Sequence, residues 1–313
     1  MEGVLLGFSI VLVITGIGLL AAALLPRATT ALIQQGLTPA IYYVTNPLLM
    51  VVLVAEIDLG ALVGVYAPVA LVTAVVAGGC YALGSRLVLR RTAGQTAVGA
   101  MASSYVNAGN IGLPIAIYAV GGSAPAVSVL VTQLLLIAPV YLTVFGWCSR
   151  QAGSSQPRLG RTVLRSVANP VTVATAAGAV LALVDWVPPE VIWTPMDMLG
   201  RASIPLLLFV FGLSLASQRP FRDRVLVPDI AWGSFVKLIL MPVAAWLLGH
   251  HAWGLQGMEL FGVVAMAALP TAQNVFLFSS QFRLPNLLVR DIVFTSAVLS
   301  LPVILAVALL LGP

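Results

Sequence analysis

Residues 103–118 read SSYVNAGNIGLPIAIY and lie inside an apolar stretch that is long enough to cross a bilayer. Two asparagines, two glycines and a proline fall between Asn107 and Pro114. Inside a helix, glycine costs about 1 kcal/mol and proline about 3 kcal/mol relative to alanine. In lipid, the backbone groups that such residues free also find no water. A helix broken at this depth therefore needs a specific reason.

Composition places the chain in a membrane. Its 313 residues are 60% hydrophobic and 8% charged, with a mean hydropathy of +1.06. Soluble domains carry about 25% charged residues. We therefore expect an all-α polytopic membrane protein that has the lipid bilayer as its environment and no nucleic-acid partner. Cys80 and Cys148 lie in different apolar segments, which predicts neither a disulfide nor a metal site.

Apolar windows of about 20 residues mark transmembrane helices. We predict ten, at about 4–25, 30–55, 62–85, 95–119, 124–147, 168–185, 192–216, 227–249, 258–281 and 288–311.

The charges predict an orientation. The loops after the odd-numbered segments hold 13 of the 15 basic residues, whereas Glu56, Asp185 and Glu190 are among the acids on the other side. By the positive-inside rule the basic side is cytoplasmic, so both termini lie outside. The cytoplasmic membrane is the expected location.

Similar motifs recur in the two halves of the chain. At an offset of 163, Thr132 aligns with Thr295, Gln133 with Ser296, Pro139 with Pro302 and Asn110 with Gln273. Five helices per half give the second copy the opposite orientation, which predicts a 5+5 inverted repeat of the kind found in transporters. The predicted domains are residues 1–148, a cytoplasmic linker at 149–165, and residues 166–313.

Two predicted helices, the fourth and the ninth, are interrupted near their centres. Such matched interruptions mark a transporter binding site, because a broken helix exposes N–H groups and carbonyls at the midplane. The alternative, a packing kink, fits one break better than two. We interpret glycines as the unwound positions, Pro114 as a first-turn proline, and the amides as end caps. The candidate substrate-binding residues are Asn107, Gly109, Asn110, Gly112 and Pro114 in the first break, and Pro270, Thr271, Gln273 and Asn274 in the second.

The runs NAGNIGLP (107–114), LPTAQN (269–274) and KLILMP (237–242) resemble the auxin efflux carrier family over nearly the whole chain. The resemblance implies a bacterial member with a fold shared with bile-acid:sodium symporters, in which the fourth and ninth helices cross. It also implies that helices one, two, six and seven form a separate scaffold, and that the substrates are organic acids such as auxin, malonate or malate.

Other intramembrane polar residues are further candidates. Lys237 is either a counter-charge for a carboxylate or a structural donor to the carbonyls of a broken helix. Gln133, Thr295 and Ser296 contact either the ligand or a helix break, and Asn46 either faces the ligand or caps a proline kink. Arg201 is expected to snorkel or to pair with Asp197, and His250 and His251 to form a solvated pair.

The leading interpretation is a secondary transporter of small organic anions, and not an enzyme. The sequence has no P-loop and no G-x-S-x-G motif. The alternatives are a sodium-coupled symporter of the bile-acid type and a ligand-binding membrane sensor. No cofactor is expected. Sodium coupling stays open, proton coupling is in doubt because no mid-depth carboxylate is found, and the assembly state is open, with a homodimer among the alternatives.

The basic-residue asymmetry predicts that the 149–165 loop is cytoplasmic. A single cysteine placed at Ser154, in a background without Cys80 and Cys148, should resist a membrane-impermeant thiol reagent in intact cells and react after lysis. Labelling from outside would contradict the orientation.

Overall fold

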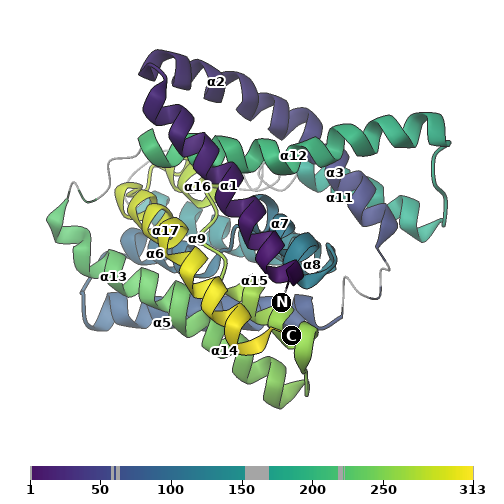
Figure 1. Cartoon of the computed structure of the whole chain (residues 1–313). Coiled ribbons are helices and arrows are strands. Elements are labelled where there is room, and N and C mark those ends of the chain that lie inside the picture. Colours follow the sequence, from purple (N-terminus) through teal and green to yellow (C-terminus); the bar gives the residue numbers. More distant parts are fainter. Residues whose placement is uncertain are drawn as a thin grey trace. The chain divides into compact units, whose positions relative to one another are not determined.

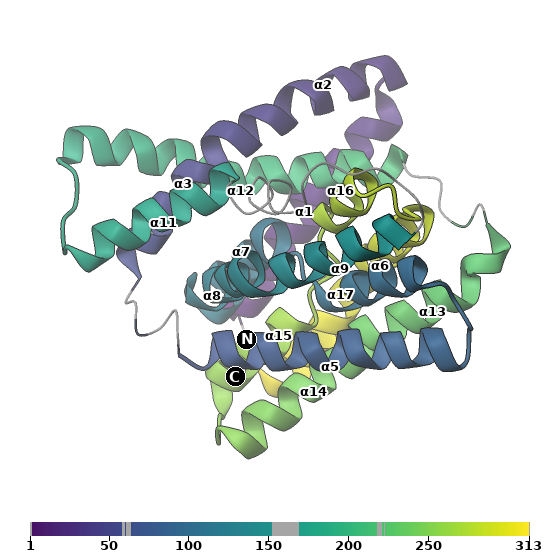
Figure 2. The ribbon, with the colours of Figure 1, turned by 180° about the vertical axis from the view of Figure 1, so that it is seen from behind.

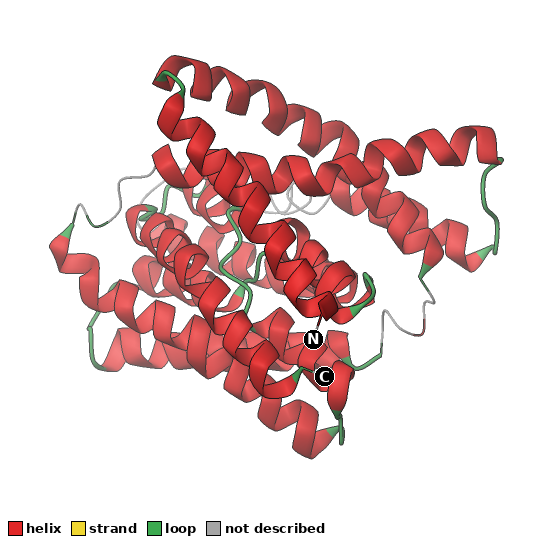
Figure 3. Cartoon of the chain, in the orientation of Figure 1, coloured by secondary structure: helices red, strands yellow, loops and turns green. Residues whose placement is uncertain are grey.

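The computed structural model describes residues 2–57, 60, 64–151, 169–217, 221 and 223–312. Within these ranges the secondary structure is helical, apart from one isolated pair of extended residues (Figures 1 and 3). The predicted linker at 149–165 falls almost wholly outside the described residues, so it stays a prediction, as do the domain boundaries.

Within the described residues six helices are long and apolar enough to cross a membrane, so the chain is a polytopic membrane protein whose described part is helical. They cover Arg27–Glu56, Tyr66–Leu87, Ala124–Arg150, Glu190–Ala216, Arg224–Ala252 and Leu287–Leu311. Four shorter apolar helices, Ser9–Leu24, Ala108–Val120, Pro170–Leu183 and Gly257–Ala267, lie in the other predicted spans. The count of ten spans itself remains a prediction.

The chain divides into two compact units, each drawn from both halves of the sequence. Unit 1 comprises Met1–Gly64, Gly109–Val131 and Ala168–Gln218. Its helices are α1 (Glu2–Leu24), α2 (Arg27–Ala40), η1 (Ile41–Thr45), α3 (Asn46–Glu56), η2 (Ala108–Gly112), α7 (Leu113–Ile115), η3 (Ala116–Val120), α8 (Ala124–Thr132), α11 (Pro170–Leu183) and α12 (Glu190–Ser217).

Close backbone approach holds unit 1 together. Helix α1 packs along α12, and α11 packs along α3 (Figure 1). A Cβ on Gly18 would strike the carbonyl of Phe209, and one on Gly212 would strike the carbonyl of Thr15. Small residues are used this way in membranes, where helices associate by close packing. The helices predicted to form a scaffold are thus all in this unit.

Unit 2 comprises Val65–Ala108, Thr132–Val167 and Arg219–Pro313. Figure 2 shows several of its helices from behind. They are α5 (Tyr66–Leu87), α6 (Ala93–Ser104), η4 (Gln133–Ile137), α9 (Ala138–Gln151), η5 (Arg224–Leu226), α13 (Val227–Phe235), η6 (Val236–Leu240), α14 (Met241–Leu247), η7 (Leu248–Ala252), α15 (Gly257–Ala267), α16 (Asn274–Gln281) and α17 (Leu287–Leu311).

The core of unit 2 lies around α6 and α15. Every residue of α6 from Thr96 to Ser104 is buried, as is every residue of α15 from Leu260 to Ala267. A helix that is apolar and small on all sides is typical of such a central position. A Cβ on Gly99 of α6 would strike the ring of Tyr81 on α5, so the two helices lie close together.

Four of the wide, π-helical turns share one cause. Turns η1, η2, η4 and η6 come just before Pro47, Pro114, Pro139 and Pro242. Proline has no N–H, and its ring clashes with the carbonyl four residues earlier. In each case that carbonyl belongs to a residue of the wide turn, which relieves the clash while the helix continues. These prolines therefore widen their helices and do not break them.

A buried ion pair fastens one end of unit 2. The Arg91 guanidinium donates to both carboxylate oxygens of Asp229, at 2.7 to 3.1 Å, and to the carbonyl of Val225 at 2.7 Å. The Asp229 side chain is 1% exposed and that of Arg91 is 20% exposed. The hydrogen bonds to Asp229 raise the pKa of Arg91 above its usual value, so the guanidinium stays charged.

We expect Arg91→Met to destabilise the protein by about 3 kcal/mol, because it leaves the Asp229 carboxylate buried without a partner. Unfolding in mixed micelles measures this. The exposed Arg201, which binds Asp197 at 2.6 Å as predicted, provides the control. Arg201→Met should cost less than about 1 kcal/mol. Equal losses in the two variants would contradict this account.

Candidate functional site

Two apolar helices of the chain are interrupted, and the interruptions meet within unit 2. Helix α6 ends at Ser104, and the chain runs extended through Tyr105, with φ −97° and ψ 108°, before helix resumes at Ala108. Helix α15 ends at Ala267 and α16 begins at Asn274. Both interruptions were predicted from the sequence.

The first break lies nearer the N-terminus than the glycines suggested. Gly109, Asn110 and Gly112 are helical residues of η2, so the reading of these glycines as the unwound positions is wrong. The role of Asn110 as an end cap stays a prediction. The extended residues are Tyr105, Val106 and Asn107, whose backbone groups are held by partners elsewhere in unit 2. Those partners, and not the conformational freedom of glycine, fix the break.

The two extended segments pair with each other. Val106 and Thr271 form an antiparallel bridge. The Asn107 N–H donates to the Pro270 carbonyl at 2.8 Å, and the Ala272 N–H donates to the Tyr105 carbonyl at 3.1 Å. In hydrocarbon an unpaired backbone group costs several kcal/mol, so each break supplies the partners that the other lacks.

Side chains complete this pairing. The Gln133 amide accepts from the Val106 N–H at 2.6 Å and donates to the Val106 carbonyl at 3.1 Å. The Ser296 hydroxyl accepts from the Thr271 N–H at 3.1 Å, and the Thr271 hydroxyl donates to the Ala102 carbonyl at 2.6 Å. The sequence had left open whether Gln133 and Ser296 contact a ligand or a helix break. In the structure both contact a break.

Lys237 lies beside the second break. Its side chain is fully buried on η6, and Nζ lies 3.1 Å from the Ala267 carbonyl and 3.2 Å from the Met241 Sδ. Ala267 is the last residue of α15, so its carbonyl is at the negative end of that helix, where a positive charge is favoured. This is the contact expected of a structural lysine. It also brings a basic group to Ala267, which is three residues before Pro270.

The remaining candidates divide between the units. Gln273 takes the N-cap position of α16 without a side-chain cap bond, and Asn274 is the first residue of that helix. Asn46 is in unit 1, ahead of Pro47, and its buried Oδ1 has no hydrogen-bond partner among the described residues. Pro114 follows η2 inside a helix that has already begun at Ala108, so the prediction that it lies in the first turn after the break is wrong.

Two further residues are engaged locally. Thr295 donates its hydroxyl to the Asp291 carbonyl of its own helix, at 2.8 Å, so its side chain is turned to the α17 backbone. His250 stacks on Trp246, with ring centroids 5.6 Å apart and planes 7° from parallel, and it is exposed, as expected of a solvated residue.

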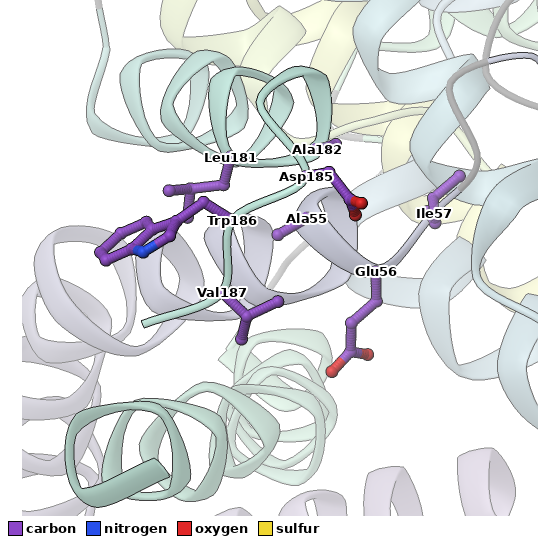
Figure 4. Close-up of a pocket in the computed structure, with 8 residues that line it drawn as sticks. All are labelled: Ala55, Glu56, Ile57, Leu181, Ala182, Asp185, Trp186 and Val187. Carbon is purple, nitrogen blue, oxygen red and sulfur yellow. The ribbon is translucent and has the colours of Figure 1, made fainter. Parts of the chain in front are cut away.

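A cavity of about 300 Å³ occurs in unit 1, and none of the predicted site residues lines it (Figure 4). Its rim carries the carboxylates of Glu56 and Asp185 beside Trp186. An acidic rim repels anions, so this cavity is a poor site for a carboxylate.

Sequence reasoning missed the pairing of Tyr105–Asn107 with Pro270–Ala272, because long-range strand-like contacts of three residues leave no periodic pattern. It also missed Asp229 as the partner of Arg91. One signal was available: Asp229 and Asp291 are acids on the basic side of the chain, where each has an arginine to bind, Arg91 and Arg290.

The family described as "Membrane transport protein" matches residues 8–307. The chain belongs to this family, the auxin efflux carriers. A relative from Rhizobium meliloti, named "Putative malonate transporter", is 27% identical over 202 residues, which are 63% of this chain and 61% of the relative. The Escherichia coli "Uncharacterized transporter YfdV" is 27% identical over 223 residues, 68% of each chain.

A rice relative, "Probable auxin efflux carrier component 1b", is 26% identical over 153 residues, which are 47% of this chain and 27% of the relative. The chain thus matches less than two thirds of the length of the first and the last of these relatives. All three are named as carriers or transporters and none as an enzyme, in agreement with the expectation that this auxin efflux carrier family member is not an enzyme.

The site geometry predicts a structural role for Gln133. Gln133→Leu leaves the Val106 N–H and carbonyl buried and unpaired, and we expect a loss of about 3 kcal/mol in stability. The control is Gln256→Leu, at an exposed glutamine whose side chain makes no cap bond, where the change should stay within about 0.5 kcal/mol. If unfolding in mixed micelles gives the same stability for both variants, Gln133 does not hold the break.

Proposed function

We propose that this protein is a secondary transporter of small organic anions, with a substrate site beside the paired breaks of unit 2. The observation that carries the proposal is the pairing of Val106 with Thr271 at the interruption of two apolar helices. Interrupted spans are built where a transporter binds its substrate, because irregular backbone in lipid is tolerated only inside protein or along a cavity.

The charges beside the breaks favour an anion. Lys237 is a buried basic side chain whose Nζ lies 3.1 Å from the carbonyl of Ala267, four residues before Thr271 of the bridge. Helix α16 begins at the end of the second break, so its positive end faces that region. Within unit 2 the buried carboxylates of Asp229 and Asp291 are each bound to an arginine. Relatives named for malonate and for auxin support the same class of substrate.

We infer ten transmembrane helices in a 5+5 inverted repeat, with crossing fourth and ninth helices. The two breaks support this arrangement, since each is held by a residue of the span that follows it: Gln133 binds Val106, and Ser296 binds Thr271. These two residues align at the offset of 163 found in the sequence. Aligned residues in the two halves thus have the same role, which is to hydrogen-bond the backbone of a broken helix.

Alternating access is the proposed mechanism, with units 1 and 2 as separate bodies in the inner membrane and both termini outside. A sodium-coupled symporter of the bile-acid type is the second candidate, because backbone carbonyls at a broken helix can hold a cation. A membrane sensor would bind the same ligands without moving them. Uptake into proteoliposomes, with and without a sodium gradient, separates the three.

Carboxylate recognition is the direct test. Calorimetry on the purified protein should show that malonate, or another small dicarboxylate from a panel, binds at least about tenfold more tightly than the amide of the same shape, because the dipole and Lys237 act only on a charged ligand. Equal affinity for acid and amide would mean that the anion assignment is wrong.

A further inference from the structure

The hydrogen-bond partners of Lys237 fit an uncharged amine. Among the described residues, Nζ has two acceptors, the Ala267 carbonyl at 3.1 Å and the Met241 Sδ at 3.2 Å. An amine has two N–H groups to donate, whereas an ammonium has three. A thioether sulfur is a weak acceptor. The protonated side chain would thus have one N–H left over in a fully buried position.

The groups around Lys237 do not supply a counter-charge. Within the described residues no carboxylate forms an ion pair with Lys237. Asp229 of α13 binds Arg91, Asp291 of α17 binds Arg290, and Glu259 of α15 is exposed. The other titratable groups on the elements that pack against η6 are Tyr66, Cys80, Tyr81 and Arg86 of α5.

A buried ammonium without a partner is strongly disfavoured, and a group in that position loses its charge. A carboxylate changes the balance, because it provides both the opposite charge and an acceptor for a third N–H. The end of α15 adds to this, since the Ala267 carbonyl favours a cation once one is present.

We propose that Lys237 takes up a proton when a carboxylate binds beside the breaks, so that the carrier moves a proton together with each anion. This inference rests on the proposed function. Before the anion binds, Lys237 is an amine. On binding, one proton passes from water to Nζ, which becomes an ammonium, and the bound carboxylate becomes its counter-ion. When the anion leaves on the other side, the proton returns to water there.

The proposal changes what is expected of coupling. A mid-depth carboxylate is the usual proton carrier, and its absence from the sequence had put proton coupling in doubt. A buried lysine can also carry a proton. On protonation it changes from neutral to positive, whereas a carboxylate changes from negative to neutral. The pair of amine and carboxylate then carries one negative charge before protonation and none after it.

The experiment is calorimetry of malonate binding at one alkaline pH, where both malonate carboxylates are ionised, in buffers of different ionisation enthalpy. We expect uptake of about one proton per malonate bound. The affinity should fall about tenfold for each unit of further increase in pH, because binding and protonation are linked. In Lys237→Arg the guanidinium is always charged, so malonate should bind without proton uptake and without that dependence on pH. Lys237→Met should take up no proton.

The outcomes separate the two claims. Malonate binding to the unmodified protein without proton uptake would overturn the coupling inference and leave the proposed function standing. Unchanged uptake in folded Lys237→Met would place the proton elsewhere and overturn the assignment to Lys237. Failure of a whole panel of carboxylates to bind would instead remove the proposed function. If neither variant folds, proton uptake by the unmodified protein still decides the first point.

Discussion

The structure of unit 2 depends on one constraint: every backbone N–H and carbonyl inside a bilayer must find a partner within the protein. An uninterrupted helix meets this requirement alone, and a broken one does not. Here each break provides hydrogen-bond partners for the other: the Asn107 N–H binds the Pro270 carbonyl, and the Ala272 N–H binds the Tyr105 carbonyl. Neither interruption would be tolerable without the other, which explains why the chain has both.

The backbone N–H and carbonyl groups that the bridge leaves unpaired form hydrogen bonds with side chains from three further helices. Gln133 of η4 binds both backbone groups of Val106, Ser296 of α17 binds the Thr271 N–H, and Lys237 of η6 binds the last carbonyl of α15. Each donor or acceptor is part of a helix that packs in unit 2, so the polar centre and the apolar core fix each other. This arrangement also explains why amides, hydroxyls and a lysine occur in a chain with 8% charged residues.

The sequence predicted the helical class, the two interruptions and the residue types around them, because composition and the cost of Gly and Pro in a helix are local properties. It placed the first break too late, at the glycines, since it had no means of seeing that Tyr105–Asn107 would be held by Pro270–Ala272. The wide turns before Pro47, Pro139 and Pro242 show the same limit. A proline in the sequence indicates that its helix must be distorted, because one hydrogen bond is lost. Whether the distortion is a kink, a wide turn or a break depends on packing against other helices.

The pairing of the breaks also limits how the protein can move. Separating Tyr105–Asn107 from Pro270–Ala272 would expose two N–H groups and two carbonyls, and each buried unpaired group costs about 1–3 kcal/mol. The sum is of the order of the stability of a whole domain. A transport cycle that opened the bridge would therefore populate its intermediate very little. In the proposed transport cycle, access to the substrate site therefore changes by movement of packed helices around an intact bridge. The hydrogen bonds that make the breaks tolerable would then also keep the proposed site in one shape while it faces first one side of the membrane and then the other.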